Sequence, residues 1–160
     1  MPSGRSAIRF DRVLLEDIAK AAAAAYPYEG CGALLGEDGH ARVMLQLPNT
    51  ERSTPRVRFE VSPEDYLRVE READARGFRL LGFWHSHPDR PALPSATDLS
   101  CAWVGLLTVI VSVQKGRARD IGAWEIRAPE LPFERVGIEC PLFAGEPVTT
   151  LSGAIAGGAR

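Results

Sequence analysis

One stretch decides both the fold and the site: Leu80-Leu81-Gly82-Phe83-Trp84-His85-Ser86-His87-Pro88, followed by a proline-rich segment and then Ser95-Ala96-Thr97-Asp98. The apolar residues before His85 predict a strand over residues 79–85 that is buried on both faces. Alternate side chains of a strand share a face, so His85 and His87 point the same way at its end. Ser86 then points away from them, and we assign it a structural role.

The two histidines and Asp98 form a possible metal site. Three prolines between His87 and Asp98 each fix their own φ angle and stiffen the connection. Two imidazole nitrogens and one carboxylate oxygen would leave a fourth tetrahedral position for water, as in catalytic zinc sites. Other interpretations stay open at this point. A His-x-His pair is common at the surface or in the core, and two histidines with a carboxylate also describe non-haem iron oxygenases.

A hydrolytic site also needs a general base. Glu29 directly precedes the apolar run 31–35, where a carboxylate is costly unless it has a partner. We therefore take Glu29 as the candidate base. The alternative is a loop glutamate that pairs with an arginine.

The remaining pattern predicts an α/β fold in which a mixed sheet carries two main helices and one short helix. Asp11 and Ser62 precede helical periodicity and predict N-caps, with Pro63 at the first position of the second helix. Residues 136–160 are expected to be a partly flexible C-terminal extension. The predicted strands are 8–10, 28–36, 41–47, 57–61, 79–85, 106–113 and 120–127, and the predicted helices are 12–26, 63–76 and 95–103.

Bulk properties exclude several classes. The 160 residues suffice for one domain with its own core, and a net charge of −2 gives no general electrostatic reason to expect nucleic acid or anionic membrane as a partner. No apolar run approaches the ~20 residues of a membrane-spanning helix, and the N-terminus does not predict a signal peptide. An odd set of 3 cysteines is typical of reduced thiols, so we expect a cytoplasmic protein.

Together these residues resemble the motif of the JAMM/MPN+ zinc metalloproteases: a distant glutamate, then His-Ser/Thr-His-Pro, six residues, Ser, two residues and Asp. Glu29, His85-Ser86-His87-Pro88, Ser95 and Asp98 match it in order and spacing. The segment 28–36 resembles the part of the family that carries the glutamate. The resemblance runs from about Phe10 to Glu125, and it identifies residues 1–135 as the catalytic domain.

The resemblance implies a fold and a set of roles. The fold would be a curved mixed sheet flanked by helices, similar to that of the cytidine deaminases, although the deaminase motif itself is absent. His85, His87 and Asp98 would bind one Zn²⁺ per chain, with water in the fourth position. Glu29 would accept a proton from that water and later donate it to the leaving amine. Ser95 would hydrogen-bond the developing oxyanion, a contact typically worth ~100–1000-fold in rate.

The family cleaves bonds after the C-terminal tail of ubiquitin or ubiquitin-like proteins. Asp98 is followed almost at once by the strand expected at Leu106, which leaves no room for the insertion of the eukaryotic deubiquitinases. The chain thus resembles the compact prokaryotic branch. The implied substrate is the Gly-Gly tail of a ubiquitin-like or sulfur-carrier protein of the ThiS/MoaD type. Capture of that tail beside residues 57–61 by strand addition is consistent with this. The sequence does not predict an oligomeric state.

Several alternatives complete the sequence-based interpretation. Some relatives are inactive scaffolds that have lost ligands, but all ligand positions and Glu29 are present here. A DNA-associated branch shares the motif, but this chain has no basic patch. Cys31 is expected to be a small buried residue, with a redox or metal-ligand role as the alternative, and Cys101 is expected in the core. A cysteine-protease mechanism using Cys31 is disfavoured.

Overall fold

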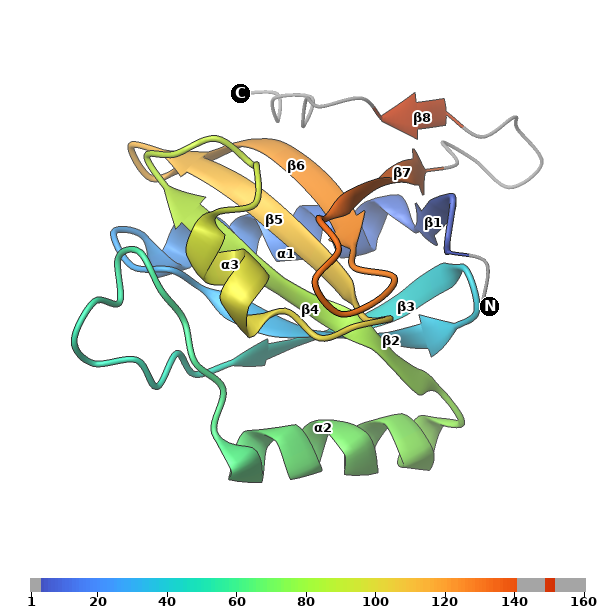
Figure 1. Cartoon of the computed structure of the whole chain (residues 1–160). Helices are drawn as coiled ribbons and strands as arrows, with labels where there is room; N and C mark the ends of the chain where they lie inside the picture. Colours follow the sequence, from blue (N-terminus) through green and yellow to red (C-terminus); the bar gives the residue numbers. More distant parts are fainter. Residues whose placement is uncertain (1–3, 141–148, 152–160) are drawn as a thin grey trace.

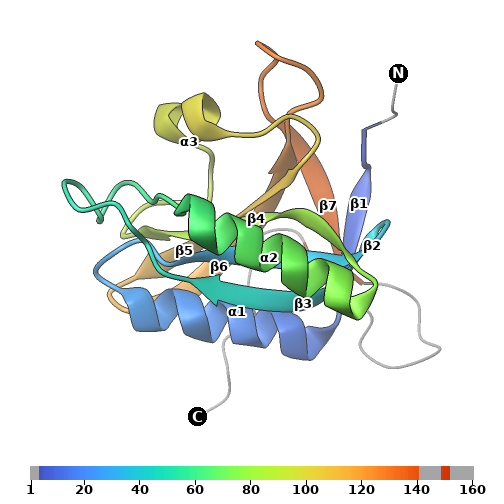
Figure 2. The ribbon, with the colours of Figure 1, turned by 90° about the horizontal axis from the view of Figure 1, so that it is seen from below.

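A strongly curved mixed sheet forms the centre of the protein (Figure 1). The computed structural model describes residues 4–140 and 149–151, and it confirms the α/β architecture. Two long helices, α1 and α2, flank the sheet, and the short helix α3 lies over one end of it (Figures 1 and 2). The elements are β1 (Ala7–Phe10), α1 (Arg12–Ala25), β2 (Cys31–Glu37), β3 (His40–Leu47), α2 (Pro63–Arg76), β4 (Arg79–Pro88), α3 (Ala96–Cys101), β5 (Leu107–Gln114), β6 (Arg117–Glu125), β7 (Glu134–Cys140) and β8 (Thr149–Leu151).

The described strands follow the order β1-β3-β2-β4-β5-β6-β7-β8. β4 lies near the middle, antiparallel to β2 and parallel to β5. The sheet curves so far that β1 pairs in parallel with both β3 and β7. The strand that carries the histidines is therefore paired along both edges, which makes it a rigid support for a site.

Side-chain alternation divides the core between the two faces of the sheet. On β2, Leu34 belongs to the cluster beneath α1, whereas Ala33 and Leu35 belong to the cluster beneath α2. On β4, Trp84 is fully buried on the α1 side. This confirms that the central strand is covered on both faces, as its continuous apolar run predicts.

The helix boundaries follow local sequence rules. Ser62 accepts a hydrogen bond from the Asp65 backbone N–H, Pro63 occupies the first turn, and Gly77 ends α2 in the left-handed region at φ 67°. Asp11 stands at the N-cap of α1, but its side chain makes no capping hydrogen bond. Its carboxylate instead lies 3.2 Å from the His40 ring.

Four sequence-based expectations need correction. Residues 57–61 form no strand, and β2 begins at Cys31, so Glu29 lies on irregular backbone before it. β4 continues through Pro88 rather than ending at residue 85. β7 was not predicted, although its buried positions Val136, Ile138 and Cys140 alternate as a strand requires.

The predicted boundary at residue 135 falls inside β7, so the sheet continues beyond that boundary through β7 to β8. The end of the tail, predicted to be loosely packed, lies outside the described residues. Among the helices that the structure describes, none has the length and apolar character needed to span a bilayer.

Candidate metal centre and general base

Three side chains converge at the end of β4. The Nε2 atoms of His85 and His87 lie 3.1 Å apart. His85 Nε2 is 3.0 Å from Asp98 Oδ1, and His87 Nε2 is 3.1 Å from Asp98 Oδ2. All three residues offer a ligand atom within 4.8 Å of the other two. The sequence-predicted cluster is therefore assembled in space.

These separations fit a tetrahedral metal ion. With zinc–ligand bonds of about 2.0–2.1 Å, two ligands of a tetrahedral site lie roughly 3.3 Å apart. His87 Nδ1 lies 3.0 Å from the Pro91 carbonyl oxygen, which can only accept a hydrogen bond. In the neutral ring Nδ1 must then carry the proton, and the Nε2 lone pair faces the cluster, as a metal ligand requires. Two imidazoles and one carboxylate are a donor set found in catalytic zinc sites.

Local backbone structure places Asp98 on this cluster. Ser95 is the N-cap of α3: its hydroxyl accepts from the Asp98 N–H at 3.1 Å, and its own N–H donates to Asp98 Oδ2 at 2.7 Å. This capping box fixes the carboxylate relative to the start of the helix. Ser95, predicted to bind an oxyanion, thus lies at the site and also has a structural role in orienting Asp98.

The protonation states also suit metal binding. Burial lowers the pKa of His85, which favours the neutral ring, and only an unprotonated nitrogen can bind a metal ion. Burial alone would raise the pKa of Asp98, but the close contacts of its carboxylate with His85 and His87 outweigh burial and hold that pKa below its ordinary value. Asp98 is therefore an anionic ligand across the physiological pH range.

Glu29 is fixed by contacts from distant parts of the chain. Its N–H donates to the Pro55 carbonyl at 2.7 Å, and its carbonyl accepts from Asn49 Nδ2 at 3.0 Å. The next residue, Gly30, donates its N–H to Ser86 Oγ at 2.8 Å and accepts from the Ser86 N–H at 3.0 Å. Ser86 thus has the expected structural role: it ties the glutamate segment to the strand that carries the histidines.

The Glu29 carboxylate is buried and partly paired. Only 2% of the residue is exposed. Burial raises its pKa to about 7, although the charges of His87 and Arg90 pull in the other direction. The Arg90 guanidinium donates to Glu29 Oε1 at 2.6 Å. A carboxylate with a pKa near neutrality can both accept and release a proton, which a general base and acid must do.

Comparisons with known proteins identify the family of this chain. Residues 11–127 match the family described as prokaryotic homologs of the JAB domain. The chain belongs to this family. Its desampylase relative from Haloferax volcanii is 34% identical over 101 residues, which cover 62% of this chain and 73% of the relative. A probable TtuB-protein conjugate cleaving protease from Thermus thermophilus is 37% identical over 73 residues, 46% of this chain and 48% of that protein.

The fold comparison reaches further. A JAB1/MPN domain protein from Archaeoglobus fulgidus superposes with a TM-score of 0.58 and 23% identity, and the match covers 85% of this chain and 99% of that one. This confirms the expected JAMM/MPN fold. The family match and the named relatives together identify this JAB-family chain as a JAMM-type isopeptidase.

A groove of about 620 Å³ borders the candidate metal centre of this JAB-domain protein. His85 and Asp98 lie in it, and His85 stacks on Phe59 with ring centroids 4.6 Å apart. Trp103 also lines the groove, and its ring centroid lies 4.9 Å from that of Tyr66 on α2. The groove is lined largely by apolar side chains, so it suits an extended peptide with few charges.

The cysteines do not join the metal cluster. Cys31 packs in the core beneath α2, its Sγ lies 3.6 Å from the Leu47 carbonyl, and burial raises its pKa to about 12. This agrees with the structural interpretation of Cys31. Cys101, which was expected in the core, is exposed at the end of α3, where it borders the groove.

Sequence reasoning missed three residues at the site. Asn49 binds the carbonyls of Glu29 and Arg58, and its Oδ1 accepts from the Glu60 N–H at 3.0 Å. Phe59 covers His85, and Arg90 pairs with Glu29. Asn49 directly follows Pro48, a pair of residues typical of turns. Nothing in the linear sequence indicates which backbone groups the Asn49 side chain binds. The sequence allows an arginine partner for Glu29 but does not identify Arg90.

Proposed function

We propose that this protein is a zinc-dependent isopeptidase that hydrolyses the bond after the C-terminal Gly-Gly of a ubiquitin-like or sulfur-carrier protein. The observation that carries the proposal is a His-His-Asp cluster that borders an apolar groove, with the segment of the buried Glu29 carboxylate tied to the histidine strand through Gly30 and Ser86. The names of the two relatives, a desampylase and a conjugate cleaving protease, point to the same substrate class.

The metal would be held by His85, His87 and Asp98. Bound zinc would supply a Lewis acid that lowers the pKa of a water molecule in the remaining coordination position to about 7. Glu29 takes the proton from the attacking water and passes it to the leaving amine. The Ser95 hydroxyl, which accepts from Asp98, keeps its own proton to donate to the developing oxyanion.

The groove accounts for the preference for glycine. Phe59 stacks on the ligand His85, so a tail that reaches the metal must pass close to an aromatic ring. A Gly-Gly tail carries no side chains that would contact this wall. Glu60 already uses its backbone N–H and carbonyl in bonds to residues 49 and 50. We therefore place strand-like capture of the tail on the other edge of residues 58–61.

The test is metal analysis combined with a cleavage assay. The purified protein should contain one zinc per chain and lose its activity on chelation. It should release a small protein from a conjugate joined through the Gly-Gly of a sulfur carrier, as read by mass spectrometry. Cleavage of an unrelated peptide, with no cleavage of several Gly-Gly conjugates, would contradict the proposed substrate. A 2-oxoglutarate requirement with bound iron would contradict the proposed chemistry.

A further inference from the structure

Arg90 reaches from the turn after β4 to the buried carboxylate of Glu29, which lies 61 residues earlier in the chain. Its Nη2 is 2.6 Å from Glu29 Oε1. Glu29 Oε2 is equally buried, yet no group among the described residues hydrogen-bonds it. Uncompensated buried carboxylate oxygens are rare, because the lost hydration is costly. One oxygen of Glu29 is thus occupied by the chain, and the other is left for a molecule that enters the site.

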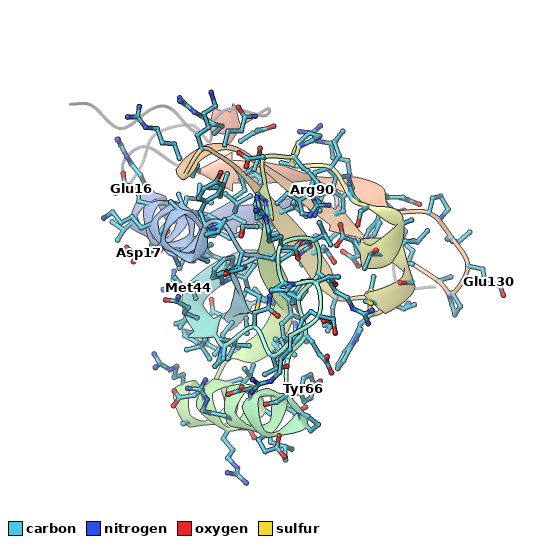
Figure 3. The ribbon with its side chains drawn as sticks, turned by 90° about the vertical axis from the view of Figure 1, so that its left-hand side faces the viewer. Glu16, Asp17, Met44, Tyr66, Arg90 and Glu130 are labelled. Carbon is cyan, nitrogen blue, oxygen red and sulfur yellow. The ribbon has the colours of Figure 1, made fainter. Side chains whose placement is uncertain are left out.

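The backbone around Arg90 is fixed on both sides. Asp89 stands in the left-handed region at φ 53°, and its carboxylate accepts from the Tyr26 hydroxyl at 2.7 Å and the Lys115 N–H at 2.8 Å. The Arg90 carbonyl accepts from Ser112 Oγ at 2.6 Å. These bonds hold the turn in one shape and direct the guanidinium to Glu29. Figure 3 shows Arg90 and Tyr66 well apart, so the arginine stands away from the α2 wall of the groove.

The pair differs from the surface ion pairs of this protein. On α2, Arg76 and Glu72 form an ion pair in which both side chains are more than 40% exposed. In the Arg90–Glu29 pair, the glutamate side chain is 1% exposed and the arginine 31%. A single guanidinium bond to a buried carboxylate is strong and directional, whereas exposed pairs contribute little.

We propose that Arg90 is a positioning residue, which fixes the Glu29 carboxylate through Oε1 so that Oε2 faces the attacking water. The inference rests on the proposed function, because it assigns Glu29 as the base. Removal of Arg90 leaves Glu29 free to turn, and fewer encounters then have the proton acceptor in place. Loss of a partner that orients a residue of a metal site typically costs about 10–100-fold.

The experiment compares Arg90→Ala and Arg90→Lys with Arg76→Ala, which breaks an exposed pair of the same chemistry. For Arg90→Ala we expect kcat to fall about 10–100-fold, in line with other orienting partners, while KM and zinc affinity stay near those of the wild type. Arg90→Lys keeps a cation and should recover part of the rate. Millimolar guanidinium ion should partly restore Arg90→Ala, but not Glu29→Gln. Arg76→Ala should match the wild type throughout.

A second measurement uses zinc-free protein and no substrate. At pH 8, the Arg90→Ala substitution should lower the Tm more in the wild-type background than in the Glu29→Gln background. Only the wild-type background contains the Glu29 carboxylate that Arg90 contacts. Arg76→Ala should change the Tm of the wild type and the Tm of Glu29→Gln by the same amount. Additive Tm shifts for Arg90, a fall in zinc affinity, or a rise in KM without a fall in kcat would each overturn the inference.

The two proposals fail in different ways. If wild-type protein with one zinc cleaves no Gly-Gly conjugate, the proposed function fails. The comparison of Tm shifts between the wild type and Glu29→Gln then decides alone whether Arg90 fixes Glu29. If the wild type cleaves and Arg90→Ala cleaves equally fast, the proposed function stands and the role of Arg90 is refuted.

Discussion

The candidate metal cluster and the Glu29 segment are held in place by different means. His85 and His87 belong to one strand, and Asp98 is fixed within its own capping box, so short-range structure places all three ligands. Glu29 lies on irregular backbone and is fixed by Asn49, Pro55 and Arg90 from elsewhere in the chain. The ligands therefore depend on local geometry, whereas the base depends on tertiary contacts. The two halves of the site should fail separately.

The largest effect on zinc binding and activity is expected from a change in the His85, His87 and Asp98 cluster. Asp98→Ala removes the carboxylate of the candidate cluster, so zinc affinity and isopeptidase activity should both fall by about 100-fold or more, beyond the loss typical of partners that only orient a ligand. Competition with a zinc chelator measures the affinity. Retention of wild-type zinc affinity would refute the ligand assignment, and the α3 variant Ser100→Ala serves as the control.

The burial of the Glu29 carboxylate should make the unfolding free energy depend on pH. Burial raises the Glu29 pKa from 4.5 to about 7. Between these pH values the folded state retains a proton that the unfolded state has lost, so rising pH destabilises the wild type but not Glu29→Gln. In zinc-free protein, the difference in unfolding free energy between the two should shift by about 3 kcal/mol from pH 4 to pH 8. Urea unfolding at both pH values tests this, and a pH-independent difference would contradict it.

Ser86 connects the two halves. Ser86→Ala leaves the buried Gly30 N–H without its acceptor, which should cost about 1–3 kcal/mol of stability. The Glu29 segment should shift while the ligands stay, so activity should fall with zinc affinity unchanged. Unfolding and chelator competition on one preparation give both numbers. Loss of zinc affinity in this variant would show that the halves are not separable.

The smallest effect is expected in the groove. Trp103 is 50% exposed and contacts Tyr66 and Phe83. Trp103→Ala should raise KM for a conjugate about tenfold, since an aromatic anchor typically contributes 1 kcal/mol or more to binding, and kcat should stay near that of the wild type. Val13→Ala, which truncates an exposed apolar residue on α1, is the matched control. Unchanged KM would place the substrate elsewhere.

The same contrast explains what the sequence could predict. The cluster was predictable because His85 and His87 obey strand periodicity and Asp98 follows at capping-box spacing from Ser95. The role of Glu29 came from the resemblance, since its local environment alone leaves an arginine pair equally open. The structure contains such a pair. Because Arg90 lies 61 residues from Glu29, no local pattern could identify it.

The errors in the fold have related causes. Residues 57–61 alternate in polarity like a strand, and Phe59 and Val61 line the groove and pack on the α2 cluster. The Glu60 backbone, however, hydrogen-bonds the Asn49 side chain and the Thr50 N–H instead of joining a strand ladder. β7 was obscured by the prolines around it, although Val136 and Ile138 carry the alternation of a half-buried strand. Hydrophobic periodicity indicates which side chains are buried, but it does not show whether a neighbouring strand pairs with the backbone.

The central claim is that Glu29 acts on water at a site formed by His85, His87 and Asp98. The most direct measurement compares wild type and Glu29→Gln, at equal measured zinc content, on one Gly-Gly conjugate. The account predicts one zinc per chain in both and cleavage about 100–10,000-fold slower in the variant, the range for loss of a general base. Equal rates at equal zinc content would contradict it.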